Sequence, residues 1–273
     1  MRIKDVFNKN RNIVVPLDLI NILSYALSLS KEKLFVNFDR ELNKKESLII
    51  DRLIGERNKG KPLAYIIKHK EFFSEKFHVD QNVLVPRPET EILVEEALKL
   101  IKNNSRTLRI MDMGTGSGVI GIIIAKKTLC EMFCIDISFS AIKVAKKNAT
   151  QFNIENNIKF ICSDLFTSLK KERIFDLILA NLPYVSQSEW DIVSEDVKTY
   201  EPGTALYGGE DGLEIYSRFV SELPYYLKKE GHVLCEIGSN FQARKMKDML
   251  ECIGLKVAIK SDLSGRERVI KGS

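Results

Sequence analysis

The sequence has few residues of the kinds that bind transition metals or form disulfides. Its 273 residues include three histidines and five cysteines. The histidines are scattered, and no two cysteines have the spacing Cys-x-x-Cys. This pattern excludes the common zinc motifs, and an odd number of cysteines fits a reducing compartment better than a disulfide framework. We therefore expect no metal site, and we expect most of the cysteines to be small buried side chains.

Long apolar runs and blocks of one charge are also missing. No run is long enough to cross a bilayer, and Arg2, Lys4 and Asp5 break up the apolar core that a signal peptide needs. The 42 basic and 37 acidic residues give a net charge of +5, without a Lys/Arg block typical of a phosphate-binding arm. We expect a cytoplasmic protein with no membrane partner. Its length suits one large domain and one small one.

The first part of the chain has the periodicity of helices. Apolar residues recur at helical spacing over residues 17–29. A second helix is predicted after Asn43, because Asn43 and Glu46 have the spacing of a capping box, and Gly60 follows its end. We predict that residues 1–62 form a small helical domain.

The composition changes at residue 63. Short aromatic and β-branched runs over residues 63–88 predict a β-hairpin linker, with a candidate turn at residues 80–82. A helix is predicted from Pro88 through Ile101. We place a second, larger domain over residues 89–273.

Strands and helices alternate in this larger part, which predicts an α/β fold with a mostly parallel sheet covered on both faces. The last two strands are short and joined by a turn, which predicts a terminal antiparallel hairpin. The predicted strands cover residues 108–112, 131–136, 158–162, 175–180, 232–237, 255–260 and 267–271, and the predicted helices cover residues 118–127, 139–152 and 212–229.

A glycine-rich turn joins the first of these strands to a helix. Three glycines, Gly114, Gly116 and Gly118, let the backbone approach a ligand closely. Asp136 ends the next strand, where an acidic residue meets ribose hydroxyls in nucleotide-binding folds. Residues 116–121 also match the dinucleotide pattern, so a dehydrogenase remains an alternative. Asp112 favours S-adenosylmethionine, because a carboxylate suits the cationic methionine end of that cofactor better than a pyrophosphate.

The predicted strand 175–180 ends in Asn181, Leu182, Pro183 and Tyr184. Such a strand delivers an amide, a proline and an aromatic ring to the edge where open α/β sheets bind ligands. The Asn181 side-chain oxygen and the Leu182 carbonyl can accept both hydrogens of a planar nitrogen, which orients it for methyl transfer. Pro183 stiffens the turn, and Tyr184 can stack on a planar group. A purely structural Asn-x-Pro turn is the alternative.

Two further segments have open roles. Asp164 follows the third strand and can accept from the exocyclic amine of an adenine that Leu165 or Phe166 covers, although an ordinary strand end has the same pattern. Residues 200–213 form a glycine-dense loop that serves either as a substrate-closing loop or as a plain connection.

Several motifs occur in an order that resembles a known family. They are residues 86–91 (Pro-Arg-Pro-Glu-Thr-Glu), 112–118 (Asp-Met-Gly-Thr-Gly-Ser-Gly), 181–184 (Asn-Leu-Pro-Tyr), 201–209 and 265–268 (Gly-Arg-Glu-Arg). They resemble the bacterial peptide-chain release factor glutamine N5-methyltransferases of the HemK/PrmC type.

The resemblance implies a class I, Rossmann-like methyltransferase domain behind a helical substrate-recognition domain. It implies S-adenosylmethionine as methyl donor and the glutamine of the Gly-Gly-Gln loop of class I release factors as acceptor. Residues 181–184 would hold the glutamine amide. The cofactor would contact Gly114, Thr115, Gly116, Ser117, Gly118, Asp136, Asp164, Leu165 and Asn181.

Two positions depart from the family pattern. The tetrapeptide is normally Asn-Pro-Pro-Tyr, and this chain has Leu182 at its second position. The acceptor there is a backbone carbonyl, so we expect slower turnover rather than loss of activity. Leu165 stands where an aromatic residue is common, which predicts weaker cofactor binding unless Phe166 covers the adenine.

Two other functions use the same motifs. An N6-adenine DNA methyltransferase has a similar tetrapeptide, but it needs a basic region that grips phosphates, and residues 1–85 have mixed charge. A catalytically weakened methyltransferase-fold binding protein is the other alternative, with Leu182 as its only sequence indication. We expect class I release factors as partners, no direct nucleic-acid partner, and a monomer.

Overall fold

The computed structural model describes residues 1–102 and 106–273. The chain divides into two compact units. Unit 1 combines residues 1–69 with residues 194–200, and unit 2 combines residues 70–193 with residues 201–273. Among the described residues, no helix is long and apolar enough to cross a membrane, and no cluster of metal-ligating side chains is found.

Unit 1 is helical, as predicted, and its helices bury one apolar cluster that includes Ile22, Leu34 and Leu53. The predicted capping box is confirmed: the Asn43 side chain accepts from Glu46 N at 2.9 Å, and the Glu46 side chain accepts from Asn43 N at 3.0 Å. Three short helices escaped prediction because they are too short to show a period. The helices are α1 (Ile3–Asn10), α2 (Pro16–Leu27), α3 (Lys31–Val36), α4 (Lys44–Asn58) and α5 (Leu63–Ile67).

A sixth helix of unit 1 comes from much later in the chain. This helix, α10 (Glu195–Tyr200), clusters with the first 69 residues. The Tyr200 hydroxyl donates to the Lys59 carbonyl at 3.1 Å. A β-carbon added to Gly60 would lie 1.8 Å from Asp196 Oδ1, so the two segments are in close contact. Unit 1 is therefore built from two separate stretches of sequence.

The predicted hairpin exists, but its turn lies elsewhere. Strands β1 (His69–Phe72) and β2 (Glu75–His78) pair through Phe73 and Ser74, whose φ values are 53° and 62°. Glu91 Oε1 accepts from Phe73 N at 2.7 Å and holds this turn. Residues 80–82 form a separate turn, and residues 63–67 are helical. The predicted boundary of the helical domain at residue 62 stays a prediction.

Unit 2 contains a seven-stranded sheet with the order β5-β4-β3-β6-β7-β9-β8. The first five strands of this order are parallel, and β8 and β9 form the predicted antiparallel hairpin. The strands are β3 (Leu108–Met113), β4 (Cys130–Asp136), β5 (Ile158–Cys162), β6 (Phe175–Ala180), β7 (Leu227–Glu236), β8 (Val257–Ser261) and β9 (Glu267–Gly272).

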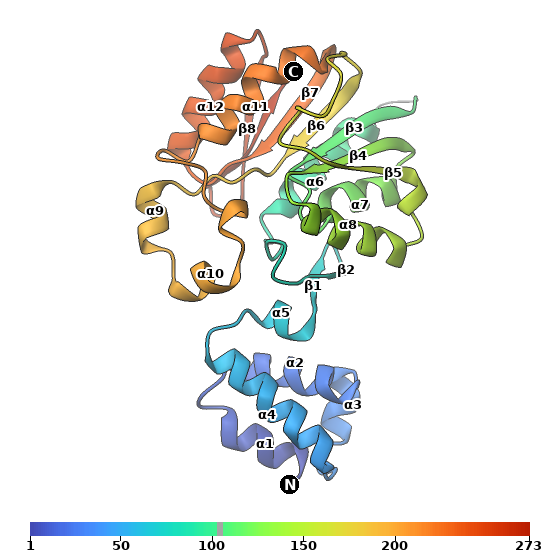
Figure 1. Ribbon diagram of the computed structural model, residues 1–273, viewed down its shortest axis with the longest axis vertical. Coiled ribbons are helices and arrows are strands. Elements are labelled where there is room, and N and C mark those ends of the chain that lie inside the picture. The colour runs from blue at the N-terminus through green and yellow to red at the C-terminus, as the bar shows by residue number, and fades with distance from the viewer. Residues whose placement is uncertain (103–105) are drawn as a thin grey trace. The chain divides into compact units, whose positions relative to one another are not determined.

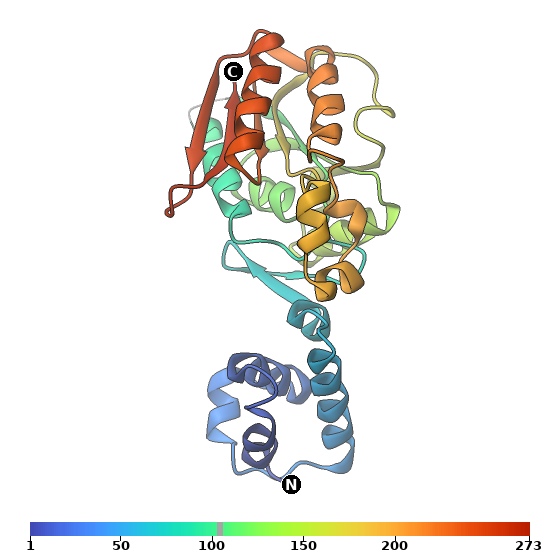
Figure 2. The same ribbon diagram turned by 90° about the vertical axis from the view of Figure 1, so that its left-hand side faces the viewer.

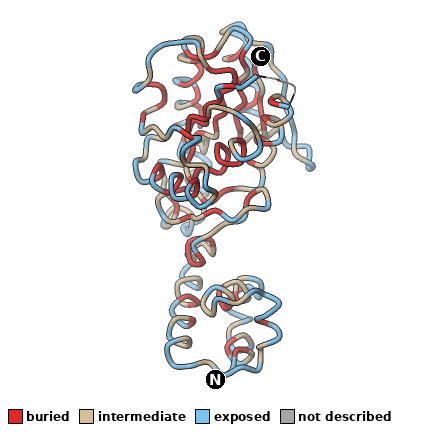
Figure 3. Tube along the Cα trace, turned by 90° about the vertical axis from the view of Figure 1, so that its right-hand side faces the viewer, coloured by how far each residue is buried: buried red, intermediate tan, exposed pale blue. Residues whose placement is uncertain are grey.

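Helices cover both faces of the sheet (Figures 1 and 2). Helices α6 (Thr90–Lys102), α7 (Val119–Lys127) and α8 (Phe139–Gln151) share one apolar cluster with Ile110, Cys134 and Leu179. Helices α11 (Glu214–Glu222) and α12 (Asn240–Cys252) share the other with Met111 and Ile178. Alternate strand residues thus face opposite helical layers. Figure 3 shows that the buried residues gather in the interior and that exposed residues lie at the periphery.

Several predicted details need correction. The helix predicted over residues 212–229 ends at Glu222, because Pro224 follows in a 3-10 turn (Leu223–Tyr225) and β7 already begins at Leu227. Helices α9 (Gln187–Ile192) and α12 were not predicted. The cysteines are less buried than expected: Cys134 and Cys235 are buried, but Cys162 and Cys252 are exposed.

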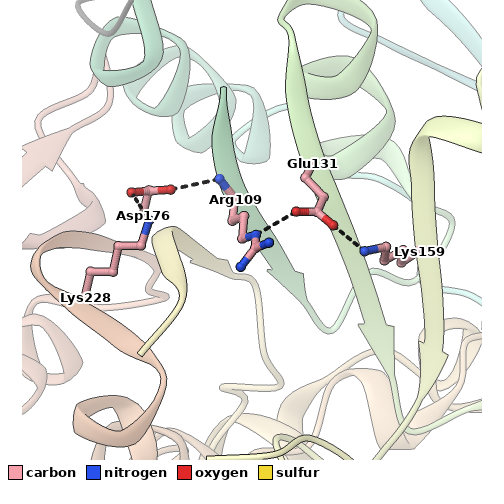
Figure 4. A network of polar contacts seen from close by, with 5 residues as sticks. All are labelled: Arg109, Glu131, Lys159, Asp176 and Lys228. Carbon is pink, nitrogen blue, oxygen red and sulfur yellow. Dashed lines mark hydrogen bonds and ion pairs between the residues drawn. The ribbon is translucent and has the colours of Figure 1, made fainter. Parts of the chain in front are cut away.

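A row of charges crosses the sheet near the start of its parallel strands (Figure 4). Each member is the second residue of its strand, and the order follows the strand order. The contacts run from Lys159 to Glu131, from Glu131 to Arg109 Nε at 2.6 Å, from Arg109 N to Asp176 at 2.9 Å, and from Asp176 to Lys228 at 2.8 Å. This network ties five strands together at the edge opposite the glycine turn.

We predict that Gly121→Ala destabilises unit 2 by about 1–3 kcal/mol. Its β-carbon would lie 2.4 Å from Cys134 Sγ, so α7 would have to move away from the sheet. Urea unfolding of the full chain measures the loss. In the Cys134→Ala background the same change should cost less, and equal costs in both backgrounds would contradict this contact as the cause.

Candidate functional site

A cavity of about 890 Å³ opens at the carboxyl edge of the parallel strands. Its wall is formed by the turn after β3, by the ends of β4, β5 and β6, and by surface segments that include residues 81–90 and 202–207. The lining residues include Leu84, Arg87, Thr90, Thr115, Gly116, Ser117, Asp136, Asp164, Leu165, Asn181, Leu182, Pro183, Trp190, Gly203 and Tyr207. The cavity lies where open α/β sheets bind ligands, within the size range of small-molecule sites.

The glycine turn has one glycine that faces open space. Gly116 has a φ of +53°, and a β-carbon placed on it would have nothing within 4 Å. Its backbone N–H donates to Asp136 Oδ2 at 2.8 Å. Gly118 is different, because its β-carbon would lie 3.1 Å from that of Ala145. The turn therefore exposes backbone at Gly116 and packs against α8 at Gly118.

Asp112 has another role than the one predicted. It is fully buried and is not among the lining residues of the cavity. Its Oδ2 accepts from the Thr115 hydroxyl at 2.6 Å and from Gly121 N at 3.1 Å. Burial raises the pKa of this carboxyl to about 6, against the two hydrogen bonds that lower it. Asp112 therefore holds the turn from behind and does not face a cationic ligand.

Asp136 lies on the cavity wall as predicted. Its two oxygens accept from Gly116 N and from Ser138 N, each at 2.8 Å. Burial raises the pKa of the carboxyl, and the two backbone donors oppose that rise. Since a carboxylate oxygen has two lone pairs, Asp136 keeps acceptor capacity toward the cavity.

The predicted adenine-facing residues separate into two groups. Asp164 and Leu165 line the cavity, and Asp164 Oδ2 pairs with Arg218 at 2.7 Å. Leu165 has a φ of +47° and is 5% exposed. Phe166 points away: it is fully buried and stacks on Tyr226 with ring centroids 4.3 Å apart. Phe166 is therefore not available to replace an aromatic residue at position 165.

Asn181 has a defined amide orientation. Its Nδ2 donates to Glu236 Oε2 at 3.0 Å and to Thr90 Oγ1 at 3.2 Å. An ionised carboxylate only accepts, so the nitrogen must face Glu236. Among the described residues, Oδ1 has no hydrogen-bond partner. The structure thus leaves an acceptor at the cavity wall, as the sequence predicted.

The other residues of the tetrapeptide fall into two groups, those that line the cavity and one that contacts Glu236 instead. Leu182 and Pro183 line the cavity, and the Leu182 carbonyl has no hydrogen-bond partner in the described part of the chain. The Leu182 N–H donates to the Tyr216 hydroxyl at 3.2 Å. Tyr184 is not among the lining residues, and its hydroxyl donates to Glu236 Oε1 at 3.1 Å. This conformation does not provide the predicted stacking surface on Tyr184.

Two motifs far apart in sequence meet beside the cavity. Glu201 is 5% exposed and accepts from Arg87 at 2.7 Å and from Val85 N at 3.1 Å. The glycine-dense loop also has a contact role, because a β-carbon on Gly208 would lie 2.6 Å from the Pro183 carbonyl. This loop therefore packs against residues 183–185 and supplies cavity wall around Gly203 and Tyr207.

Four residues of the site had no role assigned from the sequence, although Arg87 and Thr90 lie in the motif at residues 86–91. Thr90 and Glu236 hold Asn181, Arg87 lines the cavity, and Trp190 faces Tyr207 with ring centroids 6.0 Å apart. Glu236 was detectable in principle, since it is a carboxylate at the end of a predicted buried strand. Trp190 was not, because it lies on a short helix without periodicity.

Comparison with known proteins assigns both parts of the chain. Residues 16–67 match the PrmC N-terminal domain, and residues 103–252 match a methyltransferase domain. Release factor glutamine methyltransferases from Rhodopirellula baltica and Leptospira interrogans are 34% and 39% identical. These alignments cover 97% and 93% of this chain, and 92% and 89% of the relatives.

Solved structures share the fold at lower identity. The N-terminal domain of human METTL16 in complex with SAH has a TM-score of 0.57 at 19% identity, covering 92% of this chain and 93% of that one. A ribosomal protein L11 methylase from Lactobacillus delbrueckii subsp. bulgaricus has a TM-score of 0.52 at 21% identity, covering 68% and 79%. The predicted methyltransferase fold is thereby confirmed.

We predict a pH-dependent stability difference between the protein and its Asp112→Asn variant. A carboxyl whose pKa is raised by folding stabilises the protein at low pH, and this stabilisation is lost as pH rises through about 6. Relative to the variant, the free energy of unfolding should fall by about 2 kcal/mol between pH 4.5 and 7.5. Urea unfolding across this range measures it. The control is Asp248→Asn, which removes an exposed carboxyl group. If the free energy of unfolding of Asp112→Asn ran parallel to that of the parent protein over this pH range, the prediction would be wrong.

Proposed function

Because this chain belongs to the release factor glutamine methyltransferase family, we propose that it methylates the side-chain amide nitrogen (N5) of a glutamine in class I peptide-chain release factors. The acceptor we propose is the glutamine of their Gly-Gly-Gln motif, and the donor is S-adenosylmethionine. The observation that carries this proposal lies at the wall of the cavity, where neither Asn181 Oδ1 nor the Leu182 carbonyl has a hydrogen-bond partner among residues 1–102 and 106–273.

The residues around the cavity fit this cofactor. Gly116 presents backbone with open space where a side chain would stand, which allows close approach of a ligand. Asp136 offers carboxylate oxygens suited to ribose hydroxyls, and Asp164 with Leu165 offers a polar and an apolar group suited to adenine. When bound, S-adenosylmethionine supplies an electrophilic methyl group on a sulfonium sulfur.

The chain's own part in the reaction is to orient a weak nucleophile. The lone pair of an amide nitrogen is delocalised into its carbonyl group. Asn181 Oδ1 and the Leu182 carbonyl accept its two hydrogens, which fixes the direction of the nitrogen and favours charge development on it. The nitrogen then loses its proton after it gains the methyl group, so no covalent enzyme intermediate and no strong base are required.

The same proposal covers partners and location. The sequence has no Lys/Arg block of the kind that forms a phosphate-binding arm, and we propose recognition of the release factor itself, through unit 1 and the segments around the cavity. We propose that the enzyme works as a monomer in the cytoplasm, where release factors act.

A labelling experiment tests the proposed function. The full chain is incubated with methyl-labelled S-adenosylmethionine and either a class I release factor, the same factor with the glutamine of Gly-Gly-Gln replaced by alanine, or duplex DNA that contains adenine. We expect label in the intact factor only. Label in DNA alone would favour an adenine methyltransferase, and binding of the cofactor without label in any acceptor would favour a weakened binding protein.

We predict that Leu182→Pro raises turnover two- to five-fold. A proline would stiffen the turn that presents the carbonyl at this position. The substitution removes the N–H that donates to Tyr216, but the Tyr216 hydroxyl keeps its bond to the Glu236 carbonyl at 2.6 Å. Because the Leu182 side chain is 5% exposed and belongs to an apolar cluster of unit 2, we expect a loss of stability of about 1–3 kcal/mol from the lost packing. Steady-state kinetics give kcat, and an unchanged or lower value would contradict this account of the leucine.

A further inference from the structure

Glu236 ends β7 beside Asn181, which directly follows β6. The two strands are parallel neighbours, and Ala180 pairs in register with Cys235, so positions 181 and 236 are the next pair along. This register brings a carboxylate against an amide at the edge of the cavity. The Glu236 side chain is 2% exposed and does not line the cavity. It therefore acts on the site only through the residues that it holds.

We propose that Glu236 is a positioning residue that sets the hydrogen-bonding polarity of the site, by holding the Asn181 amide with its oxygen toward the substrate. This proposal rests on the proposed function. Glu236 Oε2 accepts from Asn181 Nδ2 at 3.0 Å, and Oε1 accepts from the Tyr184 hydroxyl at 3.1 Å. Both oxygens of one buried carboxylate are thus used by two members of the tetrapeptide.

The proposal depends on the difference between a carboxylate and an amide. A side-chain amide can turn by 180° at little steric cost, because its oxygen and nitrogen are almost the same size. When Glu236 is ionised, the flipped amide of Asn181 places Oδ1 against a carboxylate oxygen of Glu236, with no proton between the two oxygens to form a hydrogen bond. Thr90 alone does not impose this choice, because its hydroxyl can donate as well as accept. Glu236 therefore decides which atom of Asn181 meets the substrate.

The surroundings of Glu236 make its protonation relevant near neutral pH. Burial, and to a smaller extent Glu89, raise the pKa of the carboxyl, whereas the Thr90 and Tyr184 hydroxyls and Arg268 lower it, and the net result is a pKa of about 7. When protonated, Glu236 can donate to Asn181 Oδ1, and both amide orientations then have a partner. We therefore expect the preference for the productive orientation to be lost as pH falls through about 7.

The test compares Glu236→Gln with the full-length protein. A glutamine keeps the shape of the Glu236 side chain, but its N–H can donate to Asn181 Oδ1 and so stabilise the flipped orientation of the Asn181 amide. We expect kcat on the release factor to fall about twofold or more, because both orientations of Asn181 then have a partner, with the dissociation constant of S-adenosylmethionine unchanged. We also expect the acidic limb of the kcat–pH profile, with its midpoint near pH 7, to disappear. Glu236→Asp, which keeps the charge, should retain that limb.

A matched control and a second readout separate this role from a general loss of structure. Asp176→Asn also neutralises a buried carboxylate, at the opposite end of β6, and should lower stability without changing the kcat–pH profile. The side-chain NH₂ resonances of Asn181 are assigned as those that disappear from the spectrum of the Asn181→Asp variant. Their chemical shifts should change with a midpoint near pH 7 in the parent protein, and this change should be absent in Glu236→Gln.

Two results would overturn the proposal. One is a Glu236→Gln variant with the kcat and pH profile of the parent protein, and the other is an Asn181 resonance that does not titrate near pH 7. Failure of the parent protein to methylate any release factor is a different outcome, because it contradicts the proposed function, while the resonance still tests the contact between Glu236 and Asn181.

Discussion

The parallel pairing of β3, β4, β5, β6 and β7 is the constraint on which the site depends. Parallel strands end at one edge, and every cavity residue that we assign to methyl transfer follows one of these strands or packs against their ends. The opposite edge carries the charge row through Arg109, Glu131 and Asp176. The charge row and the functional groups are thus separated by the length of the strands, so each edge of the sheet holds its own set of polar groups.

Buried carboxylates that do not line the cavity position the groups that do line it. Asp112 holds the glycine turn through Thr115, and Glu236 holds Asn181. Both are buried at a free-energy cost that their hydrogen bonds offset only in part, as the raised pKa values of both groups indicate. A ligand in the cavity therefore meets backbone and amide groups whose directions are already fixed, and it does not have to order them on binding.

Much of this arrangement was predictable from sequence, and the part that was not has a common cause. Periodicity and turn residues predicted the succession of strands and helices along the chain, although not the order of the strands in the sheet. The glycine turn, Asp136 and Asn181 lie at the edge of the sheet where the cavity opens. Side-chain direction was harder, because Asp112, Phe166 and Tyr184 have the right positions in sequence but turn toward the core or toward Glu236. The partners Thr90, Arg87 and Glu201 come from distant segments, and only the folded chain brings them to the site.

The composition of unit 1 has a consequence for the order in which the chain folds. Its sixth helix, α10, is encoded about 130 residues after the other five. During synthesis from the amino terminus, the first five helices emerge early, but Lys59 and Gly60 cannot meet Tyr200 and Asp196 until most of the parallel sheet has been made. Completion of the helical unit is thereby coupled in time to completion of the catalytic one. A helical unit that still waits for its last helix is therefore found on a nascent chain whose parallel sheet is also incomplete.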